Sequence, residues 1–210
     1  MYYKFISIEG NIGVGKTTLA KRLSLDFKSR LLLEQFANNP FLPKFYKNPK
    51  EYAFPLELFF MAERYSQLKK HKEQDLFQPI TIADYFFIKS KLFSDTNLGP
   101  DEKRLFNRLF EIMFSSLSTP DLVVYLYSNI DRLQKNIQKR GRVFEKEISN
   151  EYLQNIQEKY LDFLNKQNMF PVLILDVSEV DFIENTRVYQ KIKSLISSKY
   201  DIGVHRFNLS

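Results

Sequence analysis

A glycine-rich segment near the start of the chain, Gly10-Asn-Ile-Gly-Val-Gly-Lys-Thr17, constrains the fold more than any other stretch. It fits the pattern G-x-x-x-x-G-K-[ST], and its neighbours supply the context that this pattern needs. The apolar residues 5–8 before it predict a strand, and residues 18–27 after it have the spacing of an amphipathic helix. We therefore interpret the segment as a phosphate-binding loop between a strand and a helix.

The residue types of this loop suit the binding of phosphate. Its glycines let the backbone curl so that successive N–H groups point into one concavity, and the helix start adds the positive end of its dipole. Lys16 is expected to reach the outer phosphates, and the Thr17 hydroxyl is expected to hold Mg²⁺. The residues expected to bind the nucleotide are Gly10, Asn11, Gly13, Gly15, Lys16, Thr17 and Thr18.

Composition narrows the class of protein. The 210 residues, 44% of them hydrophobic, suit one globular domain over residues 1–210. No run of about eighteen apolar residues predicts a membrane span, and the first strand begins too early to leave room for a signal peptide. The chain has no cysteine, so disulfides and thiolate metal sites are excluded. These features favour a cytoplasmic protein.

The net charge of +6 raises the question of a nucleic-acid partner. The lysines are scattered along the chain, and they form no block of about five or more like charges. A solvated surface with a few cations that face phosphate is therefore favoured over a nucleic-acid interface.

Short apolar segments alternate with segments of helical periodicity along the rest of the chain. Strands are expected at 5–8, 30–34, 79–84, 120–127 and 170–176. Helices are expected at about 18–27, 52–70, 85–117 (with a break at 95–100), 130–139, 150–167 and 184–199. Loop or broken helix is expected at 35–49, and residues 200–210 give no clear signal. Alternating strands and helices predict a single three-layer α/β domain with a five-stranded parallel sheet.

Three of the expected strands end in an acidic residue, at the edge where this fold class binds ligands. Asp84 is the candidate partner of Mg²⁺, although aspartate also caps helices and turns. Glu34 is the candidate base for an acceptor hydroxyl, and the alternative is a solvated acid after a strand. Asp176 is the third of these acids.

The basic segment Lys139-Arg-Gly-Arg142 follows the helix after the fourth strand. Arginines spread the charge of a transferred phosphoryl group over several donors, and a glycine lets the backbone fold over a ligand. We predict a mobile lid at about 139–148. The alternative is a basic helix end, which is favourable for the helix dipole alone.

Over nearly its whole length the chain resembles the deoxynucleoside kinase family, which includes the deoxycytidine, deoxyguanosine and deoxyadenosine kinases. The resemblance rests on residues 9–18, Glu34, 39–46 and 53–57 with their spacing to Arg64, and 140–145. It implies a P-loop kinase fold, ATP and Mg²⁺, and transfer of phosphate to the 5′-hydroxyl of a deoxynucleoside.

The resemblance also implies roles for individual residues. Glu34 matches the general base that takes the proton of the 5′-hydroxyl, and Tyr46 and Glu145 match the pair that holds the 3′-hydroxyl. Arg64 matches an arginine near the base. The catalytic residues are thus expected to be Glu34, Lys16, Arg140 and Arg142, and the substrate contacts Glu34, Tyr46, Glu57, Arg64, Asp84 and Glu145.

Three positions depart from the family pattern. Glu57 stands where the family usually has a glutamine that reads the base edge, Tyr85 where it has an arginine near the 5′-oxygen, and Ser90 where it has an aspartate. Loss of an arginine beside the reacting oxygens removes transition-state stabilisation. The departures therefore bear on rate and specificity more than on fold.

Glu57 suggests a hypothesis about the base. A carboxylate only accepts hydrogen bonds, and guanine presents two adjacent donors, N1–H and N2–H₂. The sequence therefore predicts a preference for deoxyguanosine, and a weaker one for inosine-like bases. The alternative is that Glu57 pairs with Arg64, two helical turns further on.

Two other functions stay open at this point. A nucleoside monophosphate kinase shares the loop and the lid, but it needs cations near Asp84 that Tyr85 and Phe86 do not supply. A catalytically weak paralogue, acting as the partner of an active kinase, is favoured by Tyr85 and Ser90. The intact loop, together with Glu34, Tyr46 and Glu145, opposes it.

The family resemblance and the aromatic helices around 54–65 and 102–117 predict a homodimer, although such apolar stripes also occur in ordinary cores. No nucleic-acid or membrane partner is expected.

Overall fold

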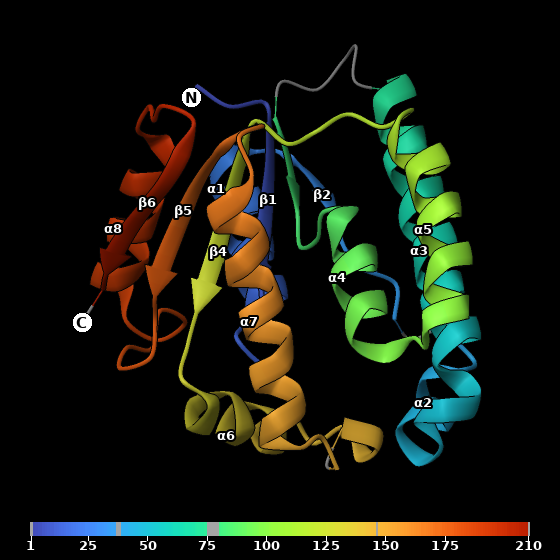
Figure 1. Cartoon of the computed structure of the whole chain (residues 1–210). Helices are drawn as coiled ribbons and strands as arrows, with labels where there is room; N and C mark the ends of the chain where they lie inside the picture. Colours follow the sequence, from blue (N-terminus) through green and yellow to red (C-terminus); the bar gives the residue numbers. More distant parts are fainter. Residues whose placement is uncertain (1, 37–38, 75–79, 146, 210) are drawn as a thin grey trace.

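The computed structural model describes residues 2–36, 39–74, 80–145 and 147–209. In this part of the chain, a six-stranded sheet of order β2-β3-β1-β4-β5-β6 runs through the molecule (Figure 1). Every pair of neighbouring strands is parallel. The strands are β1 (Phe5–Gly10), β2 (Arg30–Leu32), β3 (Thr81–Ala83), β4 (Leu122–Tyr127), β5 (Pro171–Asp176) and β6 (Gly203–Asn208).

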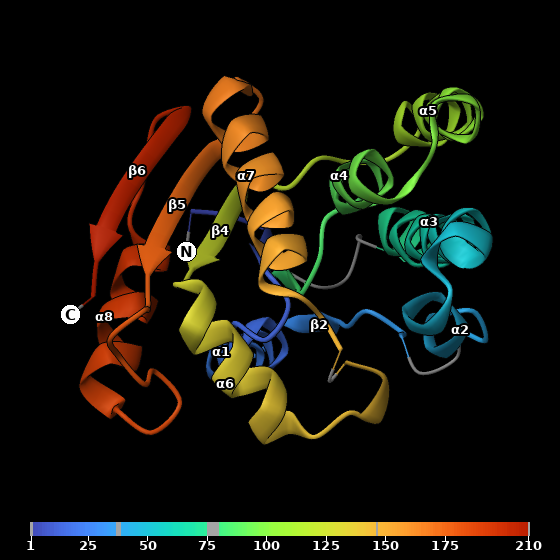
Figure 2. The ribbon, with the colours of Figure 1, turned by 60° about the horizontal axis from the view of Figure 1, so that its bottom comes forward.

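Helices cover both faces of the sheet, which confirms the expected three-layer α/β fold (Figure 2). One face carries α1 (Lys16–Phe27), α6 (Ile130–Arg140) and α8 (Thr186–Ser197). The other carries α7 (Asn150–Lys166) and α4 (Ile88–Asn97), with α3 (Pro49–Gln74) and α5 (Pro100–Phe114) packed against α4. No described helix has the length and apolar character needed to span a membrane.

The central strand β4 shows why the sheet is buried on both sides. Leu122, Val124 and Leu126 pack into the core beneath α1 and α8, whereas Val123 and Tyr125 pack into the core beneath α4 and α7. Successive side chains of a strand point to opposite faces. A strand covered on both faces therefore needs a continuous apolar run, and this run is what made β4 recognisable in the sequence.

The sheet has one strand more than the sequence predicted. β6 lies in the segment 200–210, which gave no clear signal, and among the described strands it pairs only with β5. Its residues are partly or fully exposed, because it lies at the edge of the sheet. An edge strand needs no continuous apolar run, so Gly-Val-His-Arg-Phe-Asn did not stand out as a strand.

The segment expected as loop or broken helix contains a short helix, α2 (Leu42–Lys47), followed by α3 from Pro49 onward. The two helices are separated by Asn48, whose dihedrals (φ −141°, ψ 78°) lie outside the helical region, as is favoured for the residue before a proline. α3 is longer at both ends than expected, and it contains Pro55. Pro79, expected at the start of the third strand, lies outside the described residues.

The strand order brings three chain segments to one edge of the sheet. β3 lies between β1 and β2, so the carboxyl ends of these strands are neighbours. The residues that follow them are the glycine-rich loop, Asp84 and Glu34. The backbone N–H of Asp84 donates to the carbonyl of Leu32 at 3.0 Å, which ties the two acidic segments together.

Candidate active site

The loop between β1 and α1 has the curved form that its glycines predicted. Gly13 and Gly15 have φ angles of +82° and +101°. A Cβ at Gly13 would lie 2.9 Å from the carbonyl oxygen of Leu133, and a Cβ at Gly15 would lie 2.8 Å from the ring of Phe182. Both the backbone and the surrounding space therefore require glycine at these two positions.

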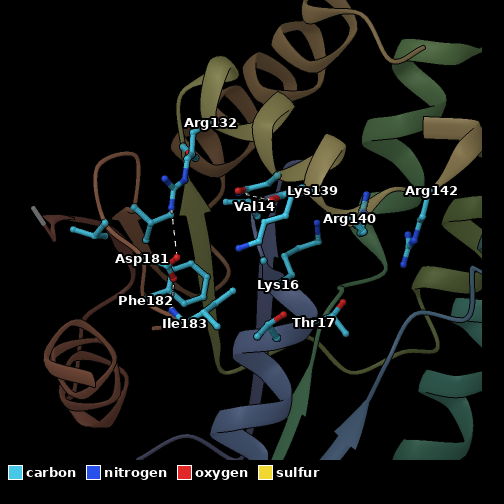
Figure 3. Close-up of a pocket in the computed structure, with 17 residues that line it drawn as sticks. Val14, Lys16, Thr17, Arg132, Lys139, Arg140, Arg142, Asp181, Phe182 and Ile183 are labelled. Carbon is cyan, nitrogen blue, oxygen red and sulfur yellow. Dashed lines mark hydrogen bonds and ion pairs between the residues drawn. The ribbon is translucent and has the colours of Figure 1, made fainter. Parts of the chain in front are cut away.

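A cavity of about 420 Å³, here called the loop cavity, opens beside this turn (Figure 3). Gly13 to Thr18 line it, and Gly10 and Asn11 do not. The Asn11 side chain instead donates to the carbonyl of Leu153 at 2.7 Å. The rest of the wall includes Arg132, Lys139, Arg140, Arg142 and Phe182. Together with Lys16, the cations among these residues would attract a polyphosphate.

Two oxygen-bearing side chains meet at the start of α1. The Thr17 hydroxyl donates to Asp84 Oδ2 at 2.5 Å, and Asp84 Oδ1 accepts from the backbone N–H of Glu34 at 2.7 Å. Mg²⁺ is usually held by one or two carboxylates together with phosphate oxygens. The Thr17–Asp84 pair therefore fits this ion. Asp176 lies elsewhere, where its carboxylate accepts from the backbone N–H of Ser178 at 2.9 Å.

A second cavity of about 110 Å³, here called the inner cavity, is also lined by residues of this loop. Gly13, Lys16, Thr17, Arg140 and Arg142 line both cavities, so the two meet at the phosphate loop. The inner cavity brings together all six residues that the sequence predicted as substrate contacts. They are Glu34, Tyr46, Glu57, Arg64, Asp84 and Glu145.

Two cations hold the Glu34 carboxylate. Its Oε1 accepts from Arg64 Nε at 2.8 Å and Nη2 at 2.5 Å, and its Oε2 accepts from Lys89 Nζ at 2.5 Å. Burial by itself would raise the pKa of Glu34. The charges and hydrogen bonds of Lys89 and Arg64 outweigh burial and hold that pKa well below its usual range. Glu34 is therefore a fixed carboxylate rather than a solvated acid.

Lys89 is the residue that the sequence reasoning missed. Tyr85, at the position of the family's arginine, is fully buried and donates its hydroxyl to Gln67 Oε1 at 2.6 Å. Lys89 lies four residues later, in the first turn of α4, and it is the second cation, beside Arg64, that contacts Glu34. The sequence did contain a signal for this role: in a segment expected to be helical, Lys89 lies one turn after Tyr85 and therefore on the same face. Ser90, which stands where the family has an aspartate, accepts from Arg64 Nη1 at 2.8 Å.

Glu57 does not pair with Arg64, whose guanidinium nitrogens donate to Glu34 and Ser90. Glu57 is 1% exposed, and its Oε1 accepts from Asn97 Nδ2 at 2.6 Å. Its Oε2 has no hydrogen-bond partner among the described residues. Burial raises the pKa of Glu57 to about 7 against the opposing charge of Arg64.

The basic segment at the end of α6 lines part of the inner cavity. Arg140 and Arg142 both donate to Glu145, which belongs to the short 3₁₀ helix Val143–Glu145. The Arg142 guanidinium lies 3.6 Å from the centre of the Phe36 ring. Phe144 stacks on Tyr46, with ring centres 5.9 Å apart. The lid residues and the residues expected to hold the sugar are therefore in contact. Lys146, within the expected lid, lies outside the described residues.

Known proteins are similar to this chain both in sequence and in fold. The family model described as deoxynucleoside kinase matches residues 6–200. The deoxyguanosine kinase of Bacillus subtilis (strain 168) is 37% identical over 194 residues, covering 90% of this chain and 93% of that protein. The deoxyadenosine/deoxycytidine kinase of the same strain is 28% identical over 198 residues, covering 92% of this chain and 91% of that protein. A structure of deoxyadenosine kinase from M. mycoides, with its products dCMP and a flexible dCDP bound, has a TM-score of 0.79. It is 25% identical in sequence and covers 92% of this chain and 100% of that one.

Proposed function

The chain belongs to the deoxynucleoside kinase family, and on this premise we propose that it transfers the γ-phosphate of ATP to the 5′-hydroxyl of a deoxynucleoside, with deoxyguanosine preferred. One observation carries the proposal. The inner cavity gathers all six expected substrate contacts, and it shares the phosphate loop with the loop cavity. A donor in one cavity and an acceptor in the other would meet at Lys16.

The donor side of the proposal rests on the loop cavity. Backbone N–H groups of the loop and the Lys16 ammonium would hold the outer phosphates of ATP. Thr17 and Asp84 would hold Mg²⁺, which when bound neutralises charge on the β- and γ-phosphates. In the structure Lys16 Nζ donates to the carbonyls of Gly10 and Asn11, at 2.9 Å each, so it already lies inside the loop.

On the acceptor side, Tyr46 and Glu145 would bind the 3′-hydroxyl of the sugar, which directs the 5′-hydroxyl toward Glu34. The 5′-oxygen forms a bond to the γ-phosphorus as the bond to the β-phosphate oxygen breaks, and ADP leaves. The hydroxyl proton passes to the Glu34 carboxylate. The guanidinium groups of Arg140 and Arg142 would stabilise the charge of the transferred group.

The low basicity of Glu34 shapes its role. A carboxylate bound by Lys89 and Arg64 is a weak base, so it would not remove the proton at the start of the reaction. Phosphoryl transfer needs little base assistance until the new bond has formed, because its transition state is loose. We therefore assign Glu34 to orienting the hydroxyl and to taking its proton once bond formation has made it acidic.

The departures at Tyr85 and Ser90 argued for a catalytically weak paralogue, and the contacts of the inner cavity argue against it. Lys89 supplies a cation beside Glu34, and Ser90 accepts a hydrogen bond from Arg64. Lys89 thus supplies the positive charge of the arginine that the family pattern led us to expect, but it does so from a position four residues further along the chain.

Deoxyguanosine is preferred in this proposal because Glu57 offers only acceptors when ionised. Guanine presents two donors on its Watson–Crick edge, N1–H and N2–H₂. The buried Oε2 of Glu57 has no partner among the described residues, and a buried carboxylate oxygen without a donor is costly. The 37% identical relative is a deoxyguanosine kinase, which supports the same choice.

A transfer assay with radiolabelled ATP tests the proposal, using the four deoxyribonucleosides and the four ribonucleosides as acceptors. We expect 5′-monophosphate from deoxyguanosine above all, and little from the ribonucleosides. Glu34→Ala should lose most of this activity and retain ATP binding. Transfer to none of the eight acceptors would reject the proposal.

Homodimer formation and a cytoplasmic location stay predictions from the sequence. Leu105 and Ile112 of α5 are 51% and 64% exposed, so this helix offers apolar surface. Light scattering of the purified protein measures its oligomeric state directly.

A further inference from the structure

The end of α4 contacts the residue that we assign to reading the base. Asn97 is the last residue of α4, and its Nδ2 donates to Glu57 Oε1 at 2.6 Å. Asn97 itself lines a neighbouring cavity of about 370 Å³, which shares Phe45, Tyr46 and Tyr152 with the inner cavity. Asn97 therefore approaches Glu57 from the neighbouring cavity and not from the inner cavity. Glu57 Oε2 has no hydrogen-bond partner among the described residues.

We propose that the choice between guanine and adenine depends on the protonation of Glu57, and that Asn97 is a positioning residue that favours the ionised, guanine-selective form. This inference rests on the proposed function, because it requires deoxynucleosides as substrates. It adds a residue and a pH dependence that the proposed function does not contain.

The hydrogen-bonding capacity of each base edge explains the switch. Ionised Glu57 offers acceptors only, which matches N1–H and N2–H₂ of guanine. Adenine presents an acceptor, N1, beside the N6–H₂ donor, so ionised Glu57 would place two acceptors against each other. Protonated Glu57 has one donor and one acceptor, as glutamine does, and it complements adenine. A site that leaves a buried polar group unpaired discriminates strongly against that substrate.

The surroundings of Glu57 put its titration within reach of an assay. Burial raises its pKa to about 7, and the charge of Arg64 and the hydrogen bond from Asn97 oppose that rise. Glu57 is therefore protonated below about pH 7 and ionised above it. The titratable and charged groups that influence it come from five segments of the chain: Glu34, Tyr46, Arg64, Lys89 and Tyr152.

Asn97 acts on this equilibrium through its amide N–H. A donated hydrogen bond stabilises the carboxylate more than the carboxylic acid, so it lowers the pKa of Glu57. Removal of the amide in Asn97→Ala therefore raises that pKa and extends the protonated form to higher pH. Asn155, which lines the same neighbouring cavity from α7, is exposed, so Asn155→Ala is a matched control.

The experiment is a competition between deoxyguanosine and deoxyadenosine in one reaction, from pH 5.5 to 9, at saturating ATP and Mg²⁺. The ratio of the two products gives the ratio of kcat/KM values. Effects of pH on ATP binding or on stability cancel in this ratio. In the wild type we expect the deoxyguanosine-to-deoxyadenosine ratio to rise with pH by up to about tenfold per unit.

The variants separate the contributions. Glu57→Gln should give a ratio that is lower and independent of pH. Asn97→Ala should shift the rise by about one pH unit to higher pH, so that the ratio at a given pH falls about tenfold. Asn155→Ala should follow the wild type. If Asn97→Ala lowers turnover, the dissociation constants of both nucleosides at pH 6 and pH 8 test the same shift, because their ratio should change with pH in the same direction.

A ratio that stays constant with pH, while both nucleosides are phosphorylated, overturns the inference and leaves the proposed function intact. A rise with pH that Asn97→Ala leaves unchanged overturns the role of Asn97. Phosphorylation of neither nucleoside overturns the proposed function, and the inference falls with it.

Discussion

Replacement of Lys89 tests whether this lysine takes the place of the arginine that the family pattern led us to expect at position 85. Lys89 Nζ lies 2.5 Å from Glu34 Oε2, and its side chain is 7% exposed. Lys89→Met keeps a flexible apolar side chain of similar length and removes the charge. Glu34 would retain only Arg64, at 2.5 Å from Oε1.

The structure sets the size of the effect on stability. Removing one partner of a buried ion pair costs about 3–5 kcal/mol, because it leaves a buried charge uncompensated. Here the second cation remains and the Glu34 side chain is 16% exposed. We therefore expect the free energy of unfolding to fall by about half as much, ~2 kcal/mol.

The expected effect on catalysis follows from the position of Lys89 beside the Glu34 carboxylate, which we propose orients the 5′-hydroxyl. Loss of one donor aimed at developing charge typically lowers kcat about 10²–10³-fold. Lys89 acts on that charge indirectly, through Glu34, so we expect Lys89→Met to lower kcat by the low end of this range, about 10²-fold.

Urea unfolding and steady-state kinetics with deoxyguanosine measure both effects. Lys91→Met is the matched control, since Lys91 lies on the same helix and pairs with Glu111 at 3.3 Å with both side chains exposed. An exposed pair contributes little, so the control should lose less than about 0.5 kcal/mol and keep its kcat. Equal stability and equal kcat in the two variants would refute the role assigned to Lys89.

Two further predictions concern the phosphate loop. Gly13→Ala should destabilise the protein by about 2–3 kcal/mol, because its backbone has φ +82° and the new Cβ would meet Leu133 and Ile137 at 2.9 Å. Gly141→Ala, at φ +72° with open space around it, should cost only about 1 kcal/mol, and equal losses in urea unfolding would contradict this explanation. ATP affinity should fall as pH rises from 7 to 9, because burial and then the charge of Lys89 lower the pKa of Lys16 to about 8. Calorimetry that finds equal affinity at both pH values would show that the Lys16 charge does not contribute.

The local parts of the fold were predictable because their signals lie close together in the sequence. The glycine-rich loop has three glycines and a lysine within seven residues, and the structure has the curved backbone that they predict. β4 and β5 were recognisable because buried parallel strands must be apolar on both faces. β6 was missed because an edge strand does not have that constraint.

The residues of the candidate site were predicted from the family resemblance and not from local sequence patterns. Glu34, Tyr46 and Glu145 come from three distant segments, and only the family resemblance indicated that they would share a cavity. The structure brings them to the inner cavity. Lys89 was not predicted as a site residue, because the family pattern has its cation at position 85. In this chain Lys89, four residues later, donates to Glu34 instead.

Glu57 shows the limit of reading one residue at a time. Its spacing to Arg64 suggested an ion pair along α3, but Arg64 bonds to Glu34 and Ser90 instead. Glu57 accepts a hydrogen bond from Asn97, which lies on another helix, and burial raises the pKa of Glu57 to about 7. Neither the partner nor the burial is encoded by local spacing.

The amino-acid sequence alone therefore determined the layered α/β architecture and the phosphate loop, since both follow from short-range patterns of apolar residues and glycines. The packing of α3 and α4 against each other decided which charges pair and which carboxylate oxygen is left without a donor. These choices depend on contacts between residues that are far apart in the chain. Desolvation and hydrogen bonding, which set the protonation of Glu34 and Glu57, exist only once those contacts have formed.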